Sequence, residues 1–186
     1  MSPPNETSSV PRRPTLATVW LDGCSGCHMS FLDMDERLLE LAELADIVYS
    51  PLVDAKEYPP DVDVCLVEGA VSSAEDLHRI KLVRERTRKL VSFGDCAVTA
   101  NVPGLRNPIG PEPLLERAYI ENVTLNPGIP LRVVPALLPR SQPVHTVVPV
   151  DVFLPGCPPS ADLIHETVLA LVAGREPRIS EARFGR

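Results

Sequence analysis

The sequence predicts an α/β protein with a doubly wound parallel sheet. Two observations support this fold class. Short apolar runs alternate along the chain with segments whose apolar residues recur at helical spacing, and several of these runs are closed by a glycine. Strands that alternate with helices pair in parallel through right-handed crossovers, and the helices then cover both faces of the sheet. A length of 186 residues suits a single domain.

The first half of the chain contains three of the expected strands. Residues 15–21 are β-branched and apolar, which predicts a buried strand, and residues 29–44 follow with leucines at helical spacing. Two further apolar runs, at 47–53 and 62–67, predict the next strands. The second of these runs is closed by Glu68.

The second half continues the alternation. Ser72 or Ser73 is the expected N-terminal cap of a helix whose apolar face reaches residue 90. Residues 90–93 (LVSF) predict a strand, residues 147–154 predict the last strand, and residues 161–173 predict a final helix.

Together these elements favour a single flavodoxin-like domain over residues 15–186. Residues 1–14 contain prolines, serines and two arginines, and no apolar stretch typical of an export signal lies before the first strand. We therefore expect a flexible N-terminal tail on a cytoplasmic protein.

One segment, from residue 98 to about 146, departs from the alternation. It holds many of the 21 prolines of the chain and a single short helical pattern, at 113–120. A segment of this length without secondary structure is uncommon in a compact domain unless it is functional or disordered. We expect this Pro-rich insertion to pack against another subunit, and a mobile insertion is the alternative.

Composition excludes several classes of partner. A formal net charge of −7 argues against nucleic acid, because phosphate binding needs a surplus of Lys and Arg. The apolar stretches are far shorter than the ~20 residues of a membrane span, so we expect none. The chain has no Walker phosphate loop and no Gly-x-Gly-x-x-Gly pattern, so NAD is not expected to bind here, and GCSGC is only a weak signal for a flavin phosphate.

Four of the five cysteines each lie just past the carboxyl end of an apolar run. Cys24 and Cys27 follow the first strand, Cys96 follows the LVSF strand and Cys157 follows the last strand. In an open parallel sheet these ends share one edge, where ligands bind. Cys65 lies inside a run and is expected to be a buried small hydrophobe. The odd number of cysteines and the lack of a secretory signal argue against a disulfide framework.

Four thiolates fit either an iron–sulfur cluster or a zinc ion. A zinc ribbon normally brings two Cys-x-x-Cys knuckles, whereas this chain has one knuckle and two lone cysteines. The spacing therefore favours a 4Fe-4S cluster. Two alternatives stay open: a structural zinc site, and a thioredoxin-type dithiol at the knuckle in which Cys96 and Cys157 have no role.

Two polar residues lie close to the expected cysteine edge. His28 follows the knuckle and could reach the cluster or a proton path, or could simply pack or cap. Glu68 closes a strand at the same edge, where its carboxylate could be functional or could bond only to backbone N–H groups. The sequence leaves both roles open.

Four segments carry a family resemblance: WLDGCSGCHMSFLD, LVEGAV, SFGDCAVTANVPGLRNP and LPGCPPSADLI. They resemble the small subunit of nickel–iron hydrogenases, most closely that of the cytoplasmic, bidirectional NAD-reducing type. The resemblance runs from Trp20 to about Gly174. It implies a flavodoxin-like domain and one 4Fe-4S cluster, proximal to the nickel–iron centre, whose ligands carry over to the cysteines at the four matching positions: Cys24, Cys27, Cys96 and Cys157.

The resemblance also implies a set of partners. Electrons would pass between the nickel–iron centre of a hydrogenase large subunit and diaphorase subunits that hold FMN, NAD and further iron–sulfur clusters. The nickel–iron site needs two Cys-x-x-Cys pairs in the large subunit, and this chain has only one pair. We therefore expect an electron-transfer subunit with no catalytic residues of its own.

Departures from the family pattern qualify this assignment. Ala100-Asn101 stands where many members have a Gly-Gly-like pair, so the loop geometry there can differ. Larger members continue into a domain with two more clusters, whereas this chain ends at Arg186 without further cysteines, so we expect a single cluster. The similar subunit of NADH:quinone oxidoreductase has adjacent cysteines in place of the knuckle. Ferredoxin-linked, membrane-linked and quinone-linked complexes remain as alternatives.

Overall fold

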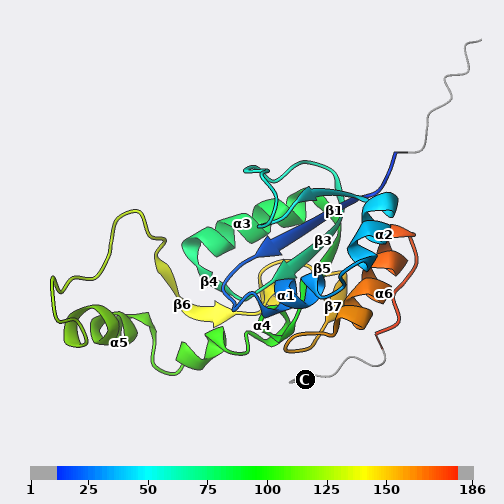
Figure 1. Cartoon of the computed structure of the whole chain (residues 1–186). Helices are drawn as coiled ribbons and strands as arrows, with labels where there is room; N and C mark the ends of the chain where they lie inside the picture. The colour runs from blue at the N-terminus through cyan, green and yellow to red at the C-terminus, as the bar shows by residue number, and fades with distance from the viewer. Residues whose placement is uncertain (1–11, 180–186) are drawn as a thin grey trace, which may run out of the picture.

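A computed structural model describes residues 12–179 of the chain (Figure 1). Its centre is a parallel sheet of five strands in the order β2-β1-β3-β5-β7. The strands are β1 (Thr15–Trp20), β2 (Asp46–Tyr49), β3 (Val62–Glu68), β5 (Thr87–Phe93) and β7 (Val152–Leu154). If only the strands of this sheet are numbered along the chain, their order is 2-1-3-4-5, which is that of flavodoxin-like domains. The predicted fold class is confirmed.

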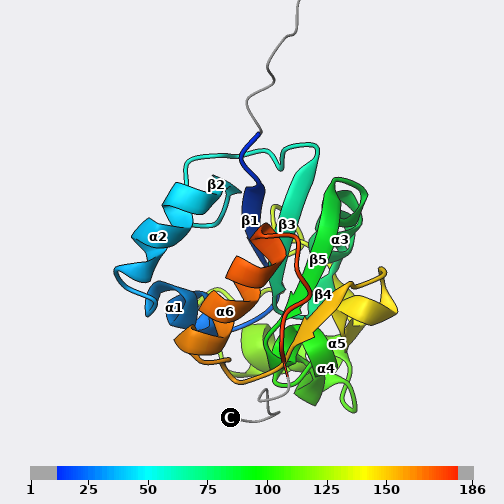
Figure 2. The same cartoon turned by 90° about the vertical axis from the view of Figure 1, so that its right-hand side faces the viewer.

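Helices cover both faces of the sheet (Figure 2). Neighbouring side chains of a strand point to opposite faces, so Leu66 joins one buried cluster and Val67 the other. Burial on both faces explains why the strands are continuous apolar runs in the sequence. The first cluster packs against α1 (Gly26–Leu32), α2 (Arg37–Leu44) and α6 (Ala161–Val172), and the second against α3 (Ala74–Glu85) and the short α4 (Asp95–Thr99).

The carboxyl ends of four neighbouring strands lie in register. Trp20, the last residue of β1, pairs with Glu68, the last residue of β3. Glu68 pairs in turn with Phe93 at the end of β5, and Phe93 pairs with Leu154 at the end of β7. The turns that follow these strands therefore leave the sheet side by side along one edge.

The helix predicted over 29–44 is two helices. α1 ends at Leu32 and α2 begins at Arg37. Between them Asp35 has a φ of +51°, a left-handed conformation that aspartate adopts more readily than most residues. Met34 in the same turn is buried, so the break is packed into the core.

Three other boundaries differ from those predicted. The helix expected to reach residue 90 ends at Glu85, and β5 begins at Thr87, whose buried hydroxyl bonds to Tyr58 at 2.7 Å. The strand predicted over 147–154 begins only at Val152. The preceding residues include a 3-10 turn and a proline, which has no N–H for the sheet. The strand predicted over 47–53 ends at Tyr49.

The Pro-rich insertion contains more structure than predicted. Besides the expected helical pattern, seen as α5 (Pro111–Glu116) and a π-helical turn η2 (Arg117–Glu121), it forms β6 (Leu137–Gln142), which pairs antiparallel with β4 (Val71–Ser73). This two-stranded sheet is absent from the prediction because β4 has only three residues, β6 contains a proline, and neither strand has alternating apolar residues. Two 3-10 turns, η1 (Pro103–Arg106) and η3 (Val144–Thr146), complete the segment. Residues 111–137, which we call the arm, project from the body of the molecule (Figure 1).

The predicted N-terminal tail, residues 1–14, lies mostly outside the described residues. Of the part that is described, Arg12 forms an ion pair with Asp63 at 2.7 Å, and the backbone oxygen of Pro14 accepts a hydrogen bond from the Asp46 N–H at 2.9 Å. Among the helices of residues 12–179, none has the length and apolarity needed to cross a membrane.

Candidate metal centre

The knuckle cysteines lie in the turn that joins β1 to α1. Cys24 is exposed, and Cys27, in the first turn of α1, is buried. Ser25 precedes the helix with a φ of +66°, and the N–H of Gly26 points to the Sγ of Cys24 at 3.4 Å. One backbone N–H of the knuckle thus already points at the sulfur of Cys24.

The other two cysteines lie in turns that are bonded to each other. The N–H of Asp95 donates to the Gly156 oxygen at 2.9 Å, and the Gly156 N–H donates to the Asp95 carboxylate at 2.7 Å. These bonds join the turn that carries Cys96 to the turn that carries the exposed Cys157. On the other side of the site, the hydroxyl of Ser30 in α1 donates to the Pro159 oxygen at 2.6 Å. Three segments far apart in sequence are therefore held together.

The four thiols influence one another electrostatically. Burial, together with the negative charges of Glu68 and of the three other cysteines, raises the pKa of Cys27 far above its usual range. Burial also raises the pKa of Cys96, with contributions from Cys24 and Cys157. The structure therefore brings all four predicted cysteines into one electrostatic neighbourhood.

The raised pKa of Cys27 has two chemical consequences. A thiol kept neutral by burial is a poor nucleophile. A metal group would have to displace the thiol proton in order to bind, so its affinity would rise with pH. The site is suited to hold a positively charged inorganic group that compensates the thiolates.

Gly94 allows the closest approach within the site. It has a φ of +81°, and a Cβ atom at this position would overlap the Sγ of Cys27. Only glycine combines this backbone conformation with the absence of a side chain. The turn after β5 and the knuckle after β1 can therefore meet because residue 94 is glycine.

Glu68 and His28 form a buried chain behind the knuckle. The Glu68 carboxylate accepts hydrogen bonds from the N–H groups of Cys27 at 3.4 Å and His28 at 3.0 Å, and it also contacts the His28 Nδ1. The other ring nitrogen of His28 lies 3.0 Å from the Thr18 hydroxyl. Glu68 therefore caps α1 and orients the knuckle, which is the backbone-bonding role that the sequence left open. The sequence could not reveal this pairing, because the two residues are 40 positions apart.

The Ala100-Asn101 pair, noted as a departure from the family pattern, also contacts the site. Ala100 has a φ of +62°, a conformation in which glycine is usual. The next residue, Asn101, donates a hydrogen bond from its side-chain amide to the Sγ of Cys157 at 3.6 Å. Asn101 is thus a contact of the site that the search for ligands and charged residues missed.

Cys65 is separate from the other cysteines, as predicted. It is fully buried in β3, and burial raises the pKa of its thiol to about 12. As for a single metal ion, no three His, Cys, Asp or Glu side chains between residues 12 and 179 are arranged to hold one.

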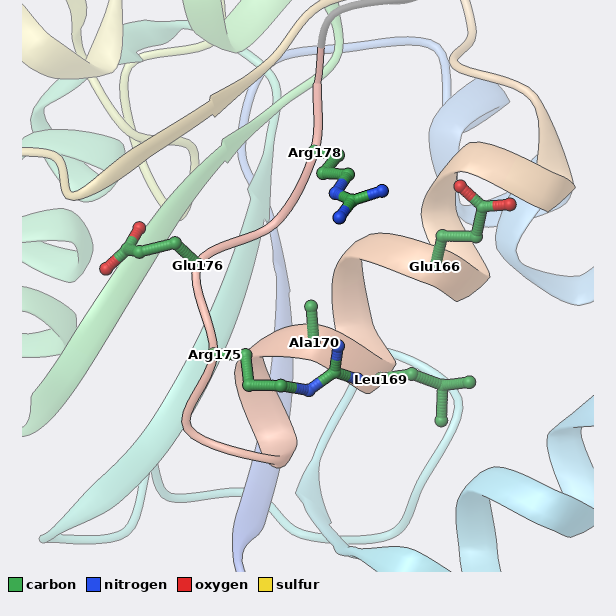
Figure 3. A pocket seen from close by; sticks show the side chains of 6 residues that line it. All are labelled: Glu166, Leu169, Ala170, Arg175, Glu176 and Arg178. Carbon is green, nitrogen blue, oxygen red and sulfur yellow. The ribbon is translucent and has the colours of Figure 1, made fainter.

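A hollow of about 380 Å³ lies away from the cysteines (Figure 3). It is lined by residues of α6 and of the segment after it, among them Glu166, Arg175 and Arg178. Glu176 at its rim pairs with Lys89 of β5 at 3.7 Å. None of the lining residues is a cysteine, so this hollow is distinct from the candidate centre.

Comparison with known proteins identifies the class of the chain. Residues 24–171 match the family described as NADH ubiquinone oxidoreductase, 20 Kd subunit. The chain belongs to this family.

Several similar proteins within this family are hydrogenase subunits. The chain is 41% identical over 165 residues to the NAD-reducing hydrogenase HoxS subunit delta of Cupriavidus necator, covering 86% of this chain and 79% of that one. It is 39% identical over 163 residues to a subunit of the F420-non-reducing vhu hydrogenase of Methanocaldococcus jannaschii, covering 87% and 57%. The chain therefore belongs to the small subunits of nickel–iron hydrogenases, and it spans about half the length of the methanogen relatives that it matches.

Solved structures agree with this placement. A crystal structure of an NAD+-reducing NiFe-hydrogenase in the H2-reduced state contains a chain that matches with a TM-score of 0.86 and 41% identity, covering 90% of this chain and 95% of that one. A NiFeSe-hydrogenase from Dm. baculatum matches with a TM-score of 0.59 at 18% identity, which shows a shared fold only.

We expect Gly94→Ala to displace Cys27 and to lower the metal content of the purified protein. The added methyl group meets the Cys27 sulfur and has to adopt a positive φ, which together cost about 2 kcal/mol or more. Iron assayed after anaerobic purification should fall well below the wild-type content. Gly128→Ala is the control, because a Cβ there has no atom within 4 Å. Unchanged iron in Gly94→Ala would show that the two turns do not depend on this contact.

Proposed function

We propose that the chain is the electron-transfer small subunit of a nickel–iron hydrogenase, and that Cys24, Cys27, Cys96 and Cys157 hold one 4Fe-4S cluster. The observation that carries this proposal is the convergence of four thiols, from three separate turns, on the carboxyl edge of the sheet. The donor set fits the group, since four thiolates are the usual ligands of such clusters. When bound, the cluster would accept and release single electrons.

The remaining residues of the site orient and tune the ligands. Glu68 holds the backbone of the knuckle through the N–H groups of Cys27 and His28. Asn101 directs an amide N–H at the sulfur of Cys157, and such bonds influence the potential of a cluster. Cys24 and Cys157 are exposed, so the centre opens to the surface on the side where a partner could exchange electrons with it.

The partners in this proposal are the large subunit, which holds the nickel–iron centre, and flavin- and NAD-binding diaphorase subunits. The NAD-linked assignment is supported by the 41% identity to the HoxS delta subunit and by the TM-score of 0.86 to the NAD+-reducing enzyme. An F420-non-reducing complex is the second candidate, because the identity to a subunit of such a hydrogenase is 39%. The cytoplasmic location expected from the sequence stays a prediction.

Cysteine substitutions test the cluster. We expect Cys24→Ser, Cys27→Ser, Cys96→Ser and Cys157→Ser each to lose most of the iron and acid-labile sulfide, from about four of each per chain, because every thiolate binds one iron. Iron, sulfide and visible absorption are measured after anaerobic purification. Cys65→Ser is the matched control and should retain the cluster, since its side chain is fully buried in the second core cluster.

Two results would contradict this part of the proposal. Tightly bound zinc without acid-labile sulfide would indicate the structural zinc alternative. Activity of the purified chain in insulin reduction, retained in the Cys96 and Cys157 variants, would instead support the dithiol alternative.

Association with a large subunit is tested separately. We expect the isolated chain to evolve no hydrogen from reduced viologen, because it lacks the second Cys-x-x-Cys pair that a nickel–iron site needs. When affinity-tagged and purified from its native host, it should bring down a nickel-containing subunit together with flavin-containing subunits that reduce NAD. Recovery of the nickel subunit without NAD-reducing partners would favour the F420-non-reducing type of complex. Hydrogen evolution by the chain alone would refute the assignment.

A further inference from the structure

The arm presents apolar side chains that its own fold does not cover. Leu125 is 80% exposed and Leu131 is 84% exposed, and the neighbouring Val133 and Val134 are also exposed. Apolar residues gathered in one projecting segment mark an interaction surface rather than an ordinary exterior. In Figure 1 the arm extends away from the main sheet.

A cleft of about 450 Å³ runs through the arm. Leu115 and Tyr119, from α5 and η2, line it together with Ile129, Leu131 and Val134 from the segment that returns to β6. Glu112 is the only charged residue among those that line it. A cleft of this composition suits an apolar ligand.

The base of the arm is fixed to the body. Asn107 and Ser141 exchange two hydrogen bonds, one from the Asn107 amide at 2.9 Å and one from the Ser141 N–H at 2.7 Å. Arg106 donates to the backbone oxygen of Ser72 at 3.0 Å. The first two bonds join the two ends of the arm to each other, and the third joins its base to β4.

The base of the arm is also continuous with the cysteine edge. A hollow of about 470 Å³ is lined by Asn101, which contacts Cys157, and by Leu105, Asn107 and Arg140 at the base of the arm. A partner that covers the cysteine edge therefore reaches the base of the arm. This continuity favours, as the occupant of the cleft, the partner that covers the cysteine edge.

The charge of the arm indicates which kind of partner surface it can bind. The arm contains the acidic residues Glu112, Glu116 and Glu121 against Arg117 and Arg132, so it is close to neutral on a chain of net charge −7. Arg117 and Glu121 moreover pair with each other at 2.6 Å. The arm thus has a surplus of only one negative charge with which to bind a charged partner, and apolar contact remains.

We propose that the cleft of the arm binds an apolar segment of the nickel–iron large subunit. This inference rests on the proposed function, because it takes the partner at the cysteine edge to be the large subunit. The arm acts as a second anchor, separate from the cluster ligands.

Photo-crosslinking in the assembled complex tests which subunit occupies the cleft of the arm. A benzoylphenylalanine at position 131, in the cleft, should crosslink to the large subunit, whereas the same group at position 39, on α2 and 70% exposed in this structure, should not. The double substitution Leu131→Asp and Val134→Asp should reduce recovery of the large subunit by about tenfold, because it places two charges in an apolar contact. Leu39→Asp is the matched control.

The outcomes separate the two proposals. A crosslink from position 131 to a diaphorase subunit or to a second copy of this chain, or none at all, overturns the docking inference even if iron and sulfide are intact. An unchanged recovery of the large subunit from the double variant overturns it as well. Absence of cluster from the wild-type complex would instead defeat the proposed function.

A second inference rests on the contact between Asn101 and Cys157. We infer that Asn101 is a positioning residue that sets the cluster potential, and this too rests on the proposed function. Its amide N–H points at the ligand sulfur at 3.6 Å. An N–H donor stabilises the more negative, reduced form of a cluster more than the oxidised form, so it raises the reduction potential.

Redox titration followed by EPR in the whole complex tests this role. Asn101→Ala and Asn101→Asp should each shift the midpoint potential to more negative values while iron and sulfide stay at wild-type content, with the larger shift in the aspartate variant, which adds a negative charge. Asn101→Ser keeps a hydrogen-bond donor, so its midpoint potential should lie closer to that of the wild type than the potential of the alanine variant does. A full cluster whose midpoint is unchanged in the alanine variant would overturn the inference.

Discussion

The alignment of the carboxyl ends of four parallel strands is the constraint on which the rest of the site depends. Trp20, Glu68, Phe93 and Leu154 are successive partners across the sheet, so the turns after them start from one line. Backbone hydrogen bonds between parallel strands fix this line without help from the cysteines. The four cysteines are therefore brought to one edge by the fold itself, and the proposed cluster would bind there.

Placing the four cysteines at one edge brings like charges together, and hydrogen bonds from the surrounding residues offset this repulsion. Burial, and then repulsion among the thiolates and the buried Glu68, raises the pKa values of Cys27 and Cys96. The buried carboxylate of Glu68 is tolerated because it accepts hydrogen bonds from N–H groups in the first turn of α1. The helix dipole also favours a negative charge at this end of a helix. The hydrogen bonds between Asp95 and Gly156 hold neighbouring turns together against the same repulsion.

The parts of the structure that were predictable from the sequence are those in which the type of a residue and its immediate neighbours indicate where it lies. Continuous apolar runs predicted the five strands of the main sheet, and a cysteine just after a run predicted its place at the edge. The break at Asp35, the pairing of β4 with β6 and the contact between Glu68 and His28 were not predictable, because each depends on a neighbour distant in sequence or on one residue's backbone angle. Asn101 was noticed only as a departure from a family pattern, and its contact with sulfur needed the structure.

In the proposed function, the exposure of Cys24 and Cys157 links electron transfer to assembly. Cys27 is buried in the core of this chain, whereas Cys24 and Cys157 reach the surface, so one side of the proposed centre is enclosed by the fold and the other is open. Water excluded from the open side would no longer stabilise the charge of a reduced cluster, and the potential of the cluster would change with it. The potential is then a property of the complex, because the partner that covers the edge completes the environment of the ligands. The proposed anchor at the arm, away from the cysteines, would allow that edge to be closed without contacts that distort the cysteine turns.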